Sequence, residues 1–452
     1  MIQITQKQLD IKKINKIYEK LIVPKVEETL RDFVQKENSY RLHPDTWVQD
    51  ALKITISFLT HYGLYGSTLS SDDLRANIMK YLLDREDNPQ EYLEGIIFSF
   101  WRYAANVCID RIIRDNGKHI DYLPDKDIIT LSKLEGIKKK VLEQTNQNKR
   151  REIFQDVLND RICCLLSNAS KKDVMEWLSG IRSIEDQEIN AIELVPMLSN
   201  ALHRKDETNG ALDLLAGIFA YDDILNRNLV AGTPRHQLLS AMNVPVCPYC
   251  NRQYITLFCN PQKGGKAQKD TVKETTADLD HFYIKSQYPY LSLSLYNFIP
   301  SCQICNSRFK GTTDFYVYPH IYPYKEGFGD NVKFTTKLDE FQAGDNGTIE
   351  LATYSSNEAV QNSISTFMLE HVYQSHTDYV NDIQRKAEKY NEKMIASLKS
   401  QFGDLLGDSR SIMDDLYGQY LDQSKFYLRP LAKLTKDILA ESYGSELEWD
   451  NI

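Results

Sequence analysis

Two Cys-x-x-C pairs constrain this chain more than any other feature of its sequence. Cys247 and Cys250 form the first pair, and Cys302 and Cys305 form the second. A Cys-x-x-C turn directs two thiolates toward one centre, so two such turns supply the four soft ligands of a tetrahedral structural zinc. Only eight cysteines occur in 452 residues, which argues against two chance pairs. The sequence therefore predicts a structural Zn²⁺ held by these four residues.

The spacing of the two pairs leaves other interpretations open. The 51 residues between Cys250 and Cys302 exceed the gap of common zinc ribbons, but the entropy of loop closure grows slowly with length. The alternatives are a pair of disulfides or four unconnected buried thiols. If the site holds zinc, all four ligands come from protein and no coordination position is open for chemistry. A reactive centre is then expected elsewhere.

Asp280 and His281 lie between the two cysteine pairs and are candidates for that centre. A carboxylate is a hard ligand that suits Mg²⁺ or Mn²⁺, and an imidazole can act as a general base near neutral pH. Neighbouring residues on one strand point to opposite faces, so one side chain can hold a metal while the other faces a water. An isolated Asp-His pair is more often a hydrogen-bonded surface pair. Asn297 and Asn306, however, follow close behind.

Together these residues resemble an HNH nuclease, a ββα-metal finger of the His-Me type. The family pattern is Asp-His on a first strand, a central Asn in the connecting loop, then Cys-x-x-C-Asn and Lys-Gly around a helix. The positions that match the pattern are Asp280, His281, Asn297, Cys302, Cys305, Asn306, Lys310 and Gly311. The resemblance is confined to residues 246–312. It departs at Ile284, where the family often has proline, and this affects the exit from the strand rather than the chemistry.

The resemblance implies a role for each matching polar residue. Asp280 and Asn306 would bind the catalytic Mg²⁺ or Mn²⁺, and His281 would activate the attacking water. Asn297 would brace the loop so that a backbone carbonyl orients the imidazole. Basic residues around the finger are candidates for phosphate contact, with ordinary surface charge as the alternative. These candidates are Arg252, Lys285, Arg308 and Lys310.

The rest of the chain has mainly helical patterns, so the predicted fold is mainly α with an embedded α+β module of the ββα-metal (HNH) zinc-knuckle type. The predicted parts are a helical region at 1–235, the nuclease module with its zinc at 240–325, and short strands followed by helices at 326–452. Pro24 should interrupt the first helical pattern. Asp45 and Ser71 are expected to cap the next two helices.

Charge and hydropathy bound the environment and the partners. The net charge of −9 is unusual for a nucleic-acid binder, so binding should be local or a partner should supply basic surface. No run of 18 apolar residues suggests a membrane span, and the first residues lack the apolar core of a secretory signal. These features and the free or metal-bound thiols predict a cytoplasmic protein without a membrane partner.

The layout of a finger inside a longer helical chain resembles nuclease subunits of bacterial anti-phage systems, such as the Septu type, which work with an ATPase. This resemblance implies an ATPase partner that docks on the helical flanks, and a nucleic-acid substrate with DNA favoured over RNA. An RNA- or tRNA-directed nuclease remains open because such a finger grips backbone rather than bases. A non-catalytic zinc module that binds nucleic acid or protein is the alternative from another class.

Overall fold

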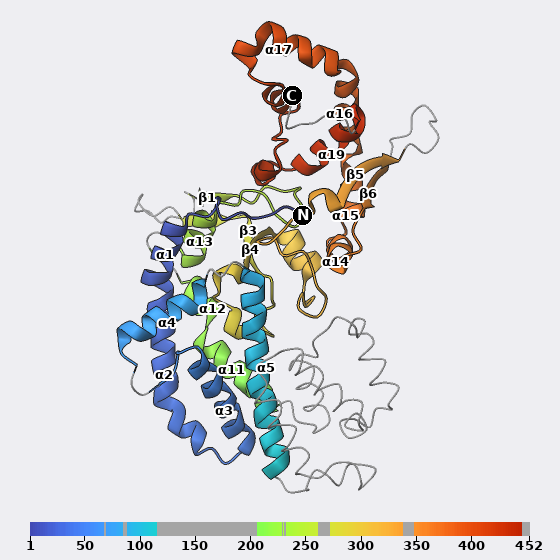
Figure 1. The fold of residues 1–452 in the computed structure, drawn as a ribbon. Coiled ribbons are helices and arrows are strands. Elements are labelled where there is room, and N and C mark those ends of the chain that lie inside the picture. The colour runs from blue at the N-terminus through green and yellow to red at the C-terminus, as the bar shows by residue number, and fades with distance from the viewer. Residues whose placement is uncertain are drawn as a thin grey trace, which may run out of the picture.

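The structure is a computed structural model. It describes residues 1–66, 69–84, 88–114, 206–227, 229, 232–260, 272–337 and 348–444. Figure 1 shows N-terminal helices at one end, C-terminal helices at the other, and short strands between them. Helices dominate the described residues, which confirms the prediction of a mainly helical protein. None of the helices described is both long and apolar enough to cross a membrane.

The N-terminal part is built from helices that pack around one another. They are α1 (Ile11–Ile17), α2 (Val23–Arg41), α3 (Thr46–His61), α4 (Ser71–Leu83), α5 (Pro89–Arg114), α11 (Asp206–Ile218), α12 (Tyr221–Leu225) and α13 (Pro234–Met242). Residues 115–205, which were included in the predicted helical region, lie outside the described residues.

Local signals explain most of the helix boundaries in this part. A π-helical turn over Tyr18–Ile22 separates α1 from α2, and Pro24 lies in the first turn of α2, where its missing N–H costs nothing. The cap of α4 differs by one residue from the prediction, because Ser70 rather than Ser71 accepts the hydrogen bond from Asp73 N. Asp45 occupies the N-cap position of α3, but its side chain makes no capping hydrogen bond.

Three two-stranded antiparallel sheets follow. Their strands are β1 (Leu257–Asn260) with β2 (Val272–Thr275), β3 (Ala277–His281) with β4 (Phe298–Cys302), and β5 (Val332–Lys337) with β6 (Thr348–Thr353). β4 leads into a short π-helix, η6 (Ile304–Lys310). The order strand, strand, helix is thus present at β3, β4 and η6.

Helices return after β6 and form the C-terminal part. They are α14 (Glu358–Thr366), α15 (Leu369–Val372), α16 (Thr377–Lys389), α17 (Glu392–Leu406), α18 (Ser409–Tyr417) and α19 (Ala432–Tyr443). α19 packs on both α16 and β5.

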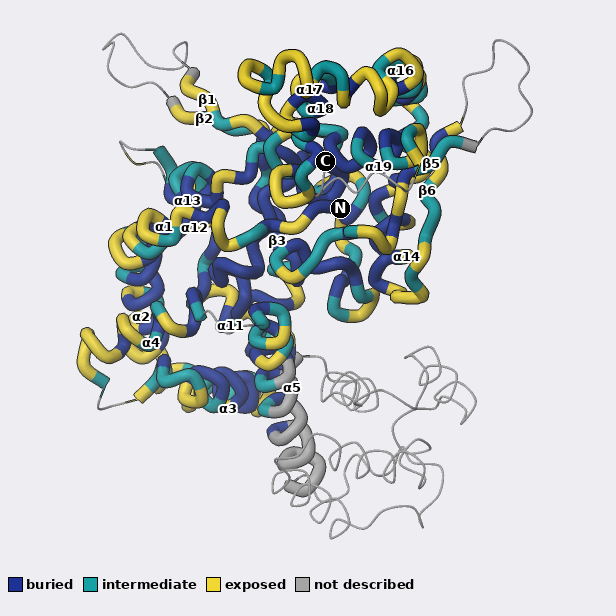
Figure 2. Tube along the Cα trace, turned by 45° about the horizontal axis from the view of Figure 1, so that its top comes forward, coloured by how far each residue is buried: buried dark blue, intermediate teal, exposed yellow. Residues whose placement is uncertain are grey.

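One hydrophobic cluster runs through all three parts of the chain. Buried members include Phe58 of α3, Phe298 of β4 and Leu434 of α19. In Figure 2 the buried segments form a continuous interior, with β3 close to its centre. The strand that carries Asp280 and His281 therefore lies within the hydrophobic core of the whole molecule.

Candidate active site and metal centre

The four predicted cysteines converge. The Sγ atoms of Cys247, Cys250, Cys302 and Cys305 all lie within 4.8 Å of one another, and all four residues are buried free thiols. Four sulfur atoms around one point match the donor set of a structural zinc site. Two separate disulfides would instead hold the sulfurs in two bonded pairs. This cluster could hold a metal ion such as zinc.

Local backbone geometry brings each cysteine pair to the cluster. In the first turn Asn251 N donates to Cys247 O at 2.8 Å, and Asn251 adopts the left-handed region with φ of 48°. The second turn joins the end of β4 to η6, and Cys305 N donates to Cys302 Sγ at 3.5 Å. Such N–H contacts favour a thiolate at the sulfur. Hydrogen bonds from the neighbouring thiols also lower the pKa of Cys302.

Asp280 and His281 are successive residues of β3 and leave the strand on opposite faces, as the alternation of a strand requires. They pair in register with Ile299 and Phe298 of β4. Asp280 faces the cysteine turns, since Tyr249 Oη donates to its Oδ2 at 2.7 Å. His281 packs on the other side, where its ring contacts those of Tyr221 and Phe298 at centroid distances of 4.6 and 5.2 Å.

Asn297 fixes the loop between the two strands. Its Oδ1 accepts from Tyr283 N at 2.8 Å, and its Nδ2 donates to the carbonyls of Tyr283 and Leu291 at 3.0 and 3.1 Å. The next carbonyl along, that of Ser292, lies 2.9 Å from His281 Nε2. A loop braced by Asn297 thus presents a backbone carbonyl to the imidazole, in the arrangement that the resemblance implies.

The Ser292 loop, defined here as residues 289–294, is also bound by the N-terminal helices. Tyr81 Oη donates to Tyr290 O at 2.8 Å, and Tyr18 Oη donates to Leu293 O at 2.9 Å. Ser292 Oγ donates to Phe219 O at 2.7 Å. Three hydrogen bonds with distant parts of the chain therefore determine where the Ser292 carbonyl lies.

The contact with Ser292 defines the tautomer of His281. A carbonyl oxygen only accepts, so Nε2 carries the proton, and Nδ1 keeps its lone pair. Nδ1 makes no hydrogen bond with any other residue that the structure describes. Burial lowers the pKa of His281 to about 4, so the ring is neutral at pH 7. A neutral imidazole with one free lone pair can accept a proton from water.

Asn306 hydrogen-bonds Asp278 rather than Asp280. Its Nδ2 donates to Asp278 Oδ2 at 3.0 Å, and Asp278 also lies 3.4 Å from the guanidinium of Arg235. Asp280 is instead paired with Lys310, whose Nζ lies 2.7 Å from Oδ1. The side chains expected to bind one divalent ion, Asp280 and Asn306, are therefore each bonded to another partner.

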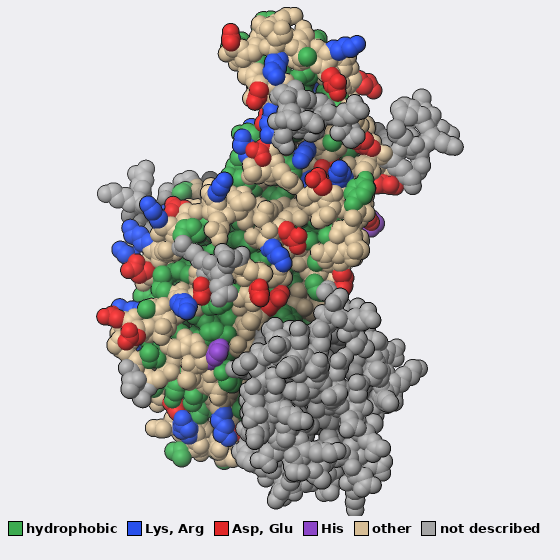
Figure 3. Space-filling view, in the orientation of Figure 1, with side chains coloured by type: hydrophobic (Ala, Val, Ile, Leu, Met, Phe, Trp, Pro, Cys, Tyr) green, Lys and Arg blue, Asp and Glu red, His purple; other side chains and the backbone are tan. Residues whose placement is uncertain are grey.

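The four candidates for phosphate contact differ in their surroundings. Lys310 is buried, and Arg252 donates to His376 Nε2 at 3.1 Å. Lys285 pairs with Asp222 at 2.7 Å and lies over the Tyr221 ring, while Arg308 is exposed. Lys310 is thus neither exposed for phosphate contact nor an ordinary surface charge, because it is buried and paired with Asp280. On the face drawn in Figure 3, acidic and basic side chains are interspersed.

Three residues contribute to this arrangement without having been predicted. Tyr249 holds Asp280, Asp278 holds Asn306, and Ser292 holds His281. Asp278 could have been found from the sequence, since it is two residues before Asp280 and therefore lies on the same face of the strand. Ser292 acts through its carbonyl, so its residue type carries no signal. Tyr249 lies between two cysteines, and only the fold shows its direction.

Comparisons with known proteins leave this site without a named relative. A scan against protein-family models finds no match, and searches among curated proteins and among solved structures find none either.

Asn297→Ala should lower the free energy of unfolding by about 3 kcal/mol or more, because it leaves the N–H and the carbonyl of Tyr283 without partners in a buried loop and removes one of the two hydrogen bonds that Leu291 O accepts. Urea unfolding followed by fluorescence measures this change. Asn226→Ala is the matched control, since Asn226 is exposed and, within the described residues, hydrogen-bonds only Asp222. The control should change stability by less than about 0.5 kcal/mol. Equal effects of the two variants would contradict the bracing role.

His320 should make the protein less stable in acid. Burial lowers its pKa to about 4, from about 6.5 in an unfolded chain. Between these two pH values the unfolded state binds more protons than the folded state. The contribution of His320 to the free energy of unfolding is therefore complete above pH 6.5 and is lost as the pH falls to 4. The full loss is about 3 kcal/mol at 1.36 kcal/mol per pKa unit. Urea unfolding at pH 7 and pH 4.5 should show a smaller pH dependence in His320→Gln.

The comparison for His320 is His371→Gln, because His371 is exposed. This variant should keep the wild-type pH dependence. The account of His320 would be wrong if His320→Gln lost as much stability as the wild type between the two pH values.

Proposed function

We propose that this protein is a metal-dependent endonuclease of the HNH type, which hydrolyses phosphodiester bonds of nucleic acid. The observation that carries the proposal is the setting of His281. Its Nε2 is held by the Ser292 carbonyl in a loop braced by Asn297, and Asp280 precedes it on the same strand. This hairpin leads directly into the four-cysteine cluster. These features agree with the pattern of residues that resembles the HNH family.

The chemistry follows from the free lone pair of the imidazole. His281 Nδ1 would take a proton from a water, and the resulting hydroxide would attack phosphorus in line with the leaving 3′ oxygen. The Ser292 carbonyl would stabilise the imidazolium through Nε2–H. A divalent ion bound by Asp280 and Asn306 would supply positive charge to the phosphate oxygens. The products would carry 5′-phosphate and 3′-hydroxyl ends.

The residues fit such an ion in type, since a carboxylate and a carboxamide are hard oxygen ligands. Among the residues described, however, the only group of three or more Cys, His, Asp or Glu suited to a metal is the cysteine cluster. Asp280 would have to exchange its bond to Lys310, whereas Asn306 bonds Asp278 through Nδ2 and would bind the ion through Oδ1. The four cysteines fit Zn²⁺, which would have a structural role only.

The substrate and partner follow from the resemblance to anti-phage nuclease subunits. We infer a nucleic-acid substrate, with DNA favoured over RNA, and an ATPase partner in a bacterial cytoplasm. The net charge of −9 supports a partner that supplies part of the binding surface. Co-purification of the chain with the protein encoded by the neighbouring gene tests this part, and failure to form a complex with an ATPase would count against it.

The second candidate is a non-catalytic zinc module that binds nucleic acid or a protein. The observation in its favour is the buried ion pair between Asp280 and Lys310, together with the hydrogen bond from Tyr249, so that each oxygen of the carboxylate already has a donor from the protein. In this interpretation the pair is structural and no divalent ion binds.

Incubation with plasmid DNA and with RNA, in Mg²⁺ or Mn²⁺ and with or without the partner, separates the two candidates. The nuclease should nick or cut at least one substrate, and a ligase should reseal the nicks because their ends carry 5′-phosphate. Asp280→Asn should remove this activity. Retention of both nucleic acids intact in all conditions, together with saturable binding to one of them, would favour the zinc module.

A further inference from the structure

Lys310 occupies an unusual position for a lysine. Its side chain is 2% exposed and that of Asp280 is 5% exposed, and Nζ donates to Asp280 Oδ1 at 2.7 Å. Nζ also donates to the backbone carbonyl of His281 and lies 4.9 Å from the centre of the Phe315 ring. Tyr249 Oη holds the other oxygen of Asp280. The carboxylate therefore has an internal cation and an internal hydroxyl donor.

This arrangement has a consequence for any divalent ion that binds at Asp280. A buried ammonium and a divalent cation repel each other strongly at contact distance, because the interior screens charge less than water does. Each oxygen of the carboxylate also already accepts one hydrogen bond, Oδ1 from Lys310 and Oδ2 from Tyr249, so the ion would bind an oxygen that already has a donor. One carboxylate with little access to water compensates one buried cation, not two.

We propose that Lys310 is a resident counter-ion of Asp280, and that a divalent ion binds this carboxylate only by displacing the Lys310 ammonium. This inference rests on the proposed function, since it assumes that Asp280 is a metal ligand. Lys310 is the last residue of η6, and Gly311 follows with φ of 51°, a conformation that favours glycine. A released Lys310 would reach solvent and could then contact a substrate phosphate, as the sequence predicts.

The first test measures Mn²⁺ binding by zinc-loaded protein without nucleic acid. Free Mn²⁺ is followed by electron paramagnetic resonance during a titration. Lys310→Met removes the competing charge and should lower the Kd for Mn²⁺ at least tenfold relative to wild type. Lys310→Arg keeps the charge and should bind Mn²⁺ as weakly as wild type. Zinc at the cysteines does not confuse the result, since thiolates are poor ligands for Mn²⁺.

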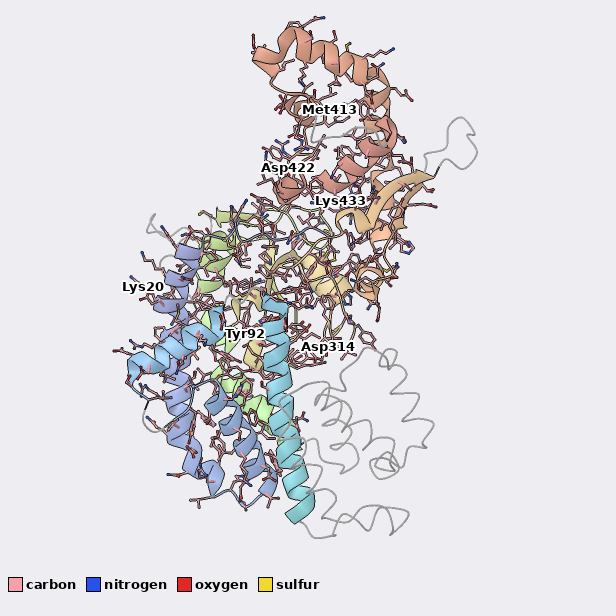
Figure 4. All side chains as sticks on the ribbon, in the orientation of Figure 1. Lys20, Tyr92, Asp314, Met413, Asp422 and Lys433 are labelled. Carbon is pink, nitrogen blue, oxygen red and sulfur yellow. The ribbon has the colours of Figure 1, made fainter. Side chains whose placement is uncertain are left out.

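Lys433 provides the matched control. It is a second buried lysine, and it pairs with Asp437 at 2.9 Å with side-chain exposures of 4% and 6%. Figure 4 labels it among the C-terminal elements, on α19. Lys433→Met should lose stability, as any broken buried pair does, but should leave the Kd for Mn²⁺ unchanged.

A second measurement needs no substitution, so it remains valid if Lys310→Met fails to fold. Brief acetylation of the wild-type protein, read by mass spectrometry, reports which lysines are accessible. Lys310 should be protected without Mn²⁺ and should become several-fold more reactive as Mn²⁺ saturates. Lys433 should stay protected throughout.

The outcomes distinguish a failure of the Lys310 displacement from a failure of the proposed nuclease function. Saturable Mn²⁺ binding that Asp280→Asn abolishes, but that is equal or weaker in Lys310→Met, would overturn the displacement while leaving the proposed function intact. Unchanged protection of Lys310 at saturating Mn²⁺ would overturn it as well. Absence of any Asp280-dependent Mn²⁺ binding, in wild type and in Lys310→Met, would remove the catalytic metal and the displacement together.

Discussion

Cys302→Ser should abolish tight zinc binding and unfold the β3–β4 hairpin together with η6. Three thiolates and a hydroxyl cannot complete the soft tetrahedral donor set that the four converging sulfurs provide. Metal binding and folding are coupled in such sites, so the loss could reach the order of 10 kcal/mol of local stability. Zinc content measured with a chromophoric chelator and near-ultraviolet circular dichroism would report the two losses.

Cys259→Ser is the matched control for this substitution. Cys259 is an exposed free thiol on β1 and lies outside the cluster. The Cys259→Ser variant should keep a full equivalent of zinc and the near-ultraviolet circular dichroism spectrum of the wild type. The metal centre would be disproved if Cys302→Ser kept its zinc, or if the wild-type protein bound none after refolding with Zn²⁺.

His281→Ala should reduce cleavage by a factor of about 10² to 10⁴, the usual contribution of a positioned general base. The reason is that Nδ1 of the neutral imidazole carries the free lone pair, while the Ser292 carbonyl holds the ring through Nε2. Zinc content and the far-ultraviolet spectrum should stay as in the wild type, because the cysteines do not depend on this ring. Initial rates of plasmid nicking in Mg²⁺ and Mn²⁺ measure the effect.

The control here is His371→Ala, which removes an exposed imidazole from α15. Its nicking rate should match that of the wild type. Wild-type rates in His281→Ala would rule out the proposed role of His281, whereas a loss of zinc in that variant would show that the effect was structural.

The sequence predicted those parts of the site that depend on short-range geometry. A Cys-x-x-C turn positions two thiols wherever it occurs, so the grouping of Cys247 with Cys250 needed no knowledge of the fold. The alternation of side chains along a strand likewise placed Asp280 and His281 on opposite faces. Most helices were also predictable, because apolar spacing and proline act over a few residues, as at Pro24 in α2.

The parts that were not predicted depend on which distant groups meet. Lys310 is a candidate for phosphate contact in the sequence, but its pairing with Asp280, 30 residues away, depends on the fold. Asn306 could equally have met Asp280 or Asp278, since both lie on one face of β3. The sequence spacing of Asn306 from the strand cannot tell which of the two carboxylates it meets, because that depends on how the helix packs against the strand.

The hydrogen bonds from Tyr18 and Tyr81 to the Ser292 loop have a mechanical consequence. Any displacement of α4, or of the π-helical turn before α2, would pull on the backbone that holds the imidazole of His281. A protein that pressed on those N-terminal elements could thus alter the geometry of the base without touching it. It would do so across a sequence separation of 209 residues between Tyr81 and Tyr290.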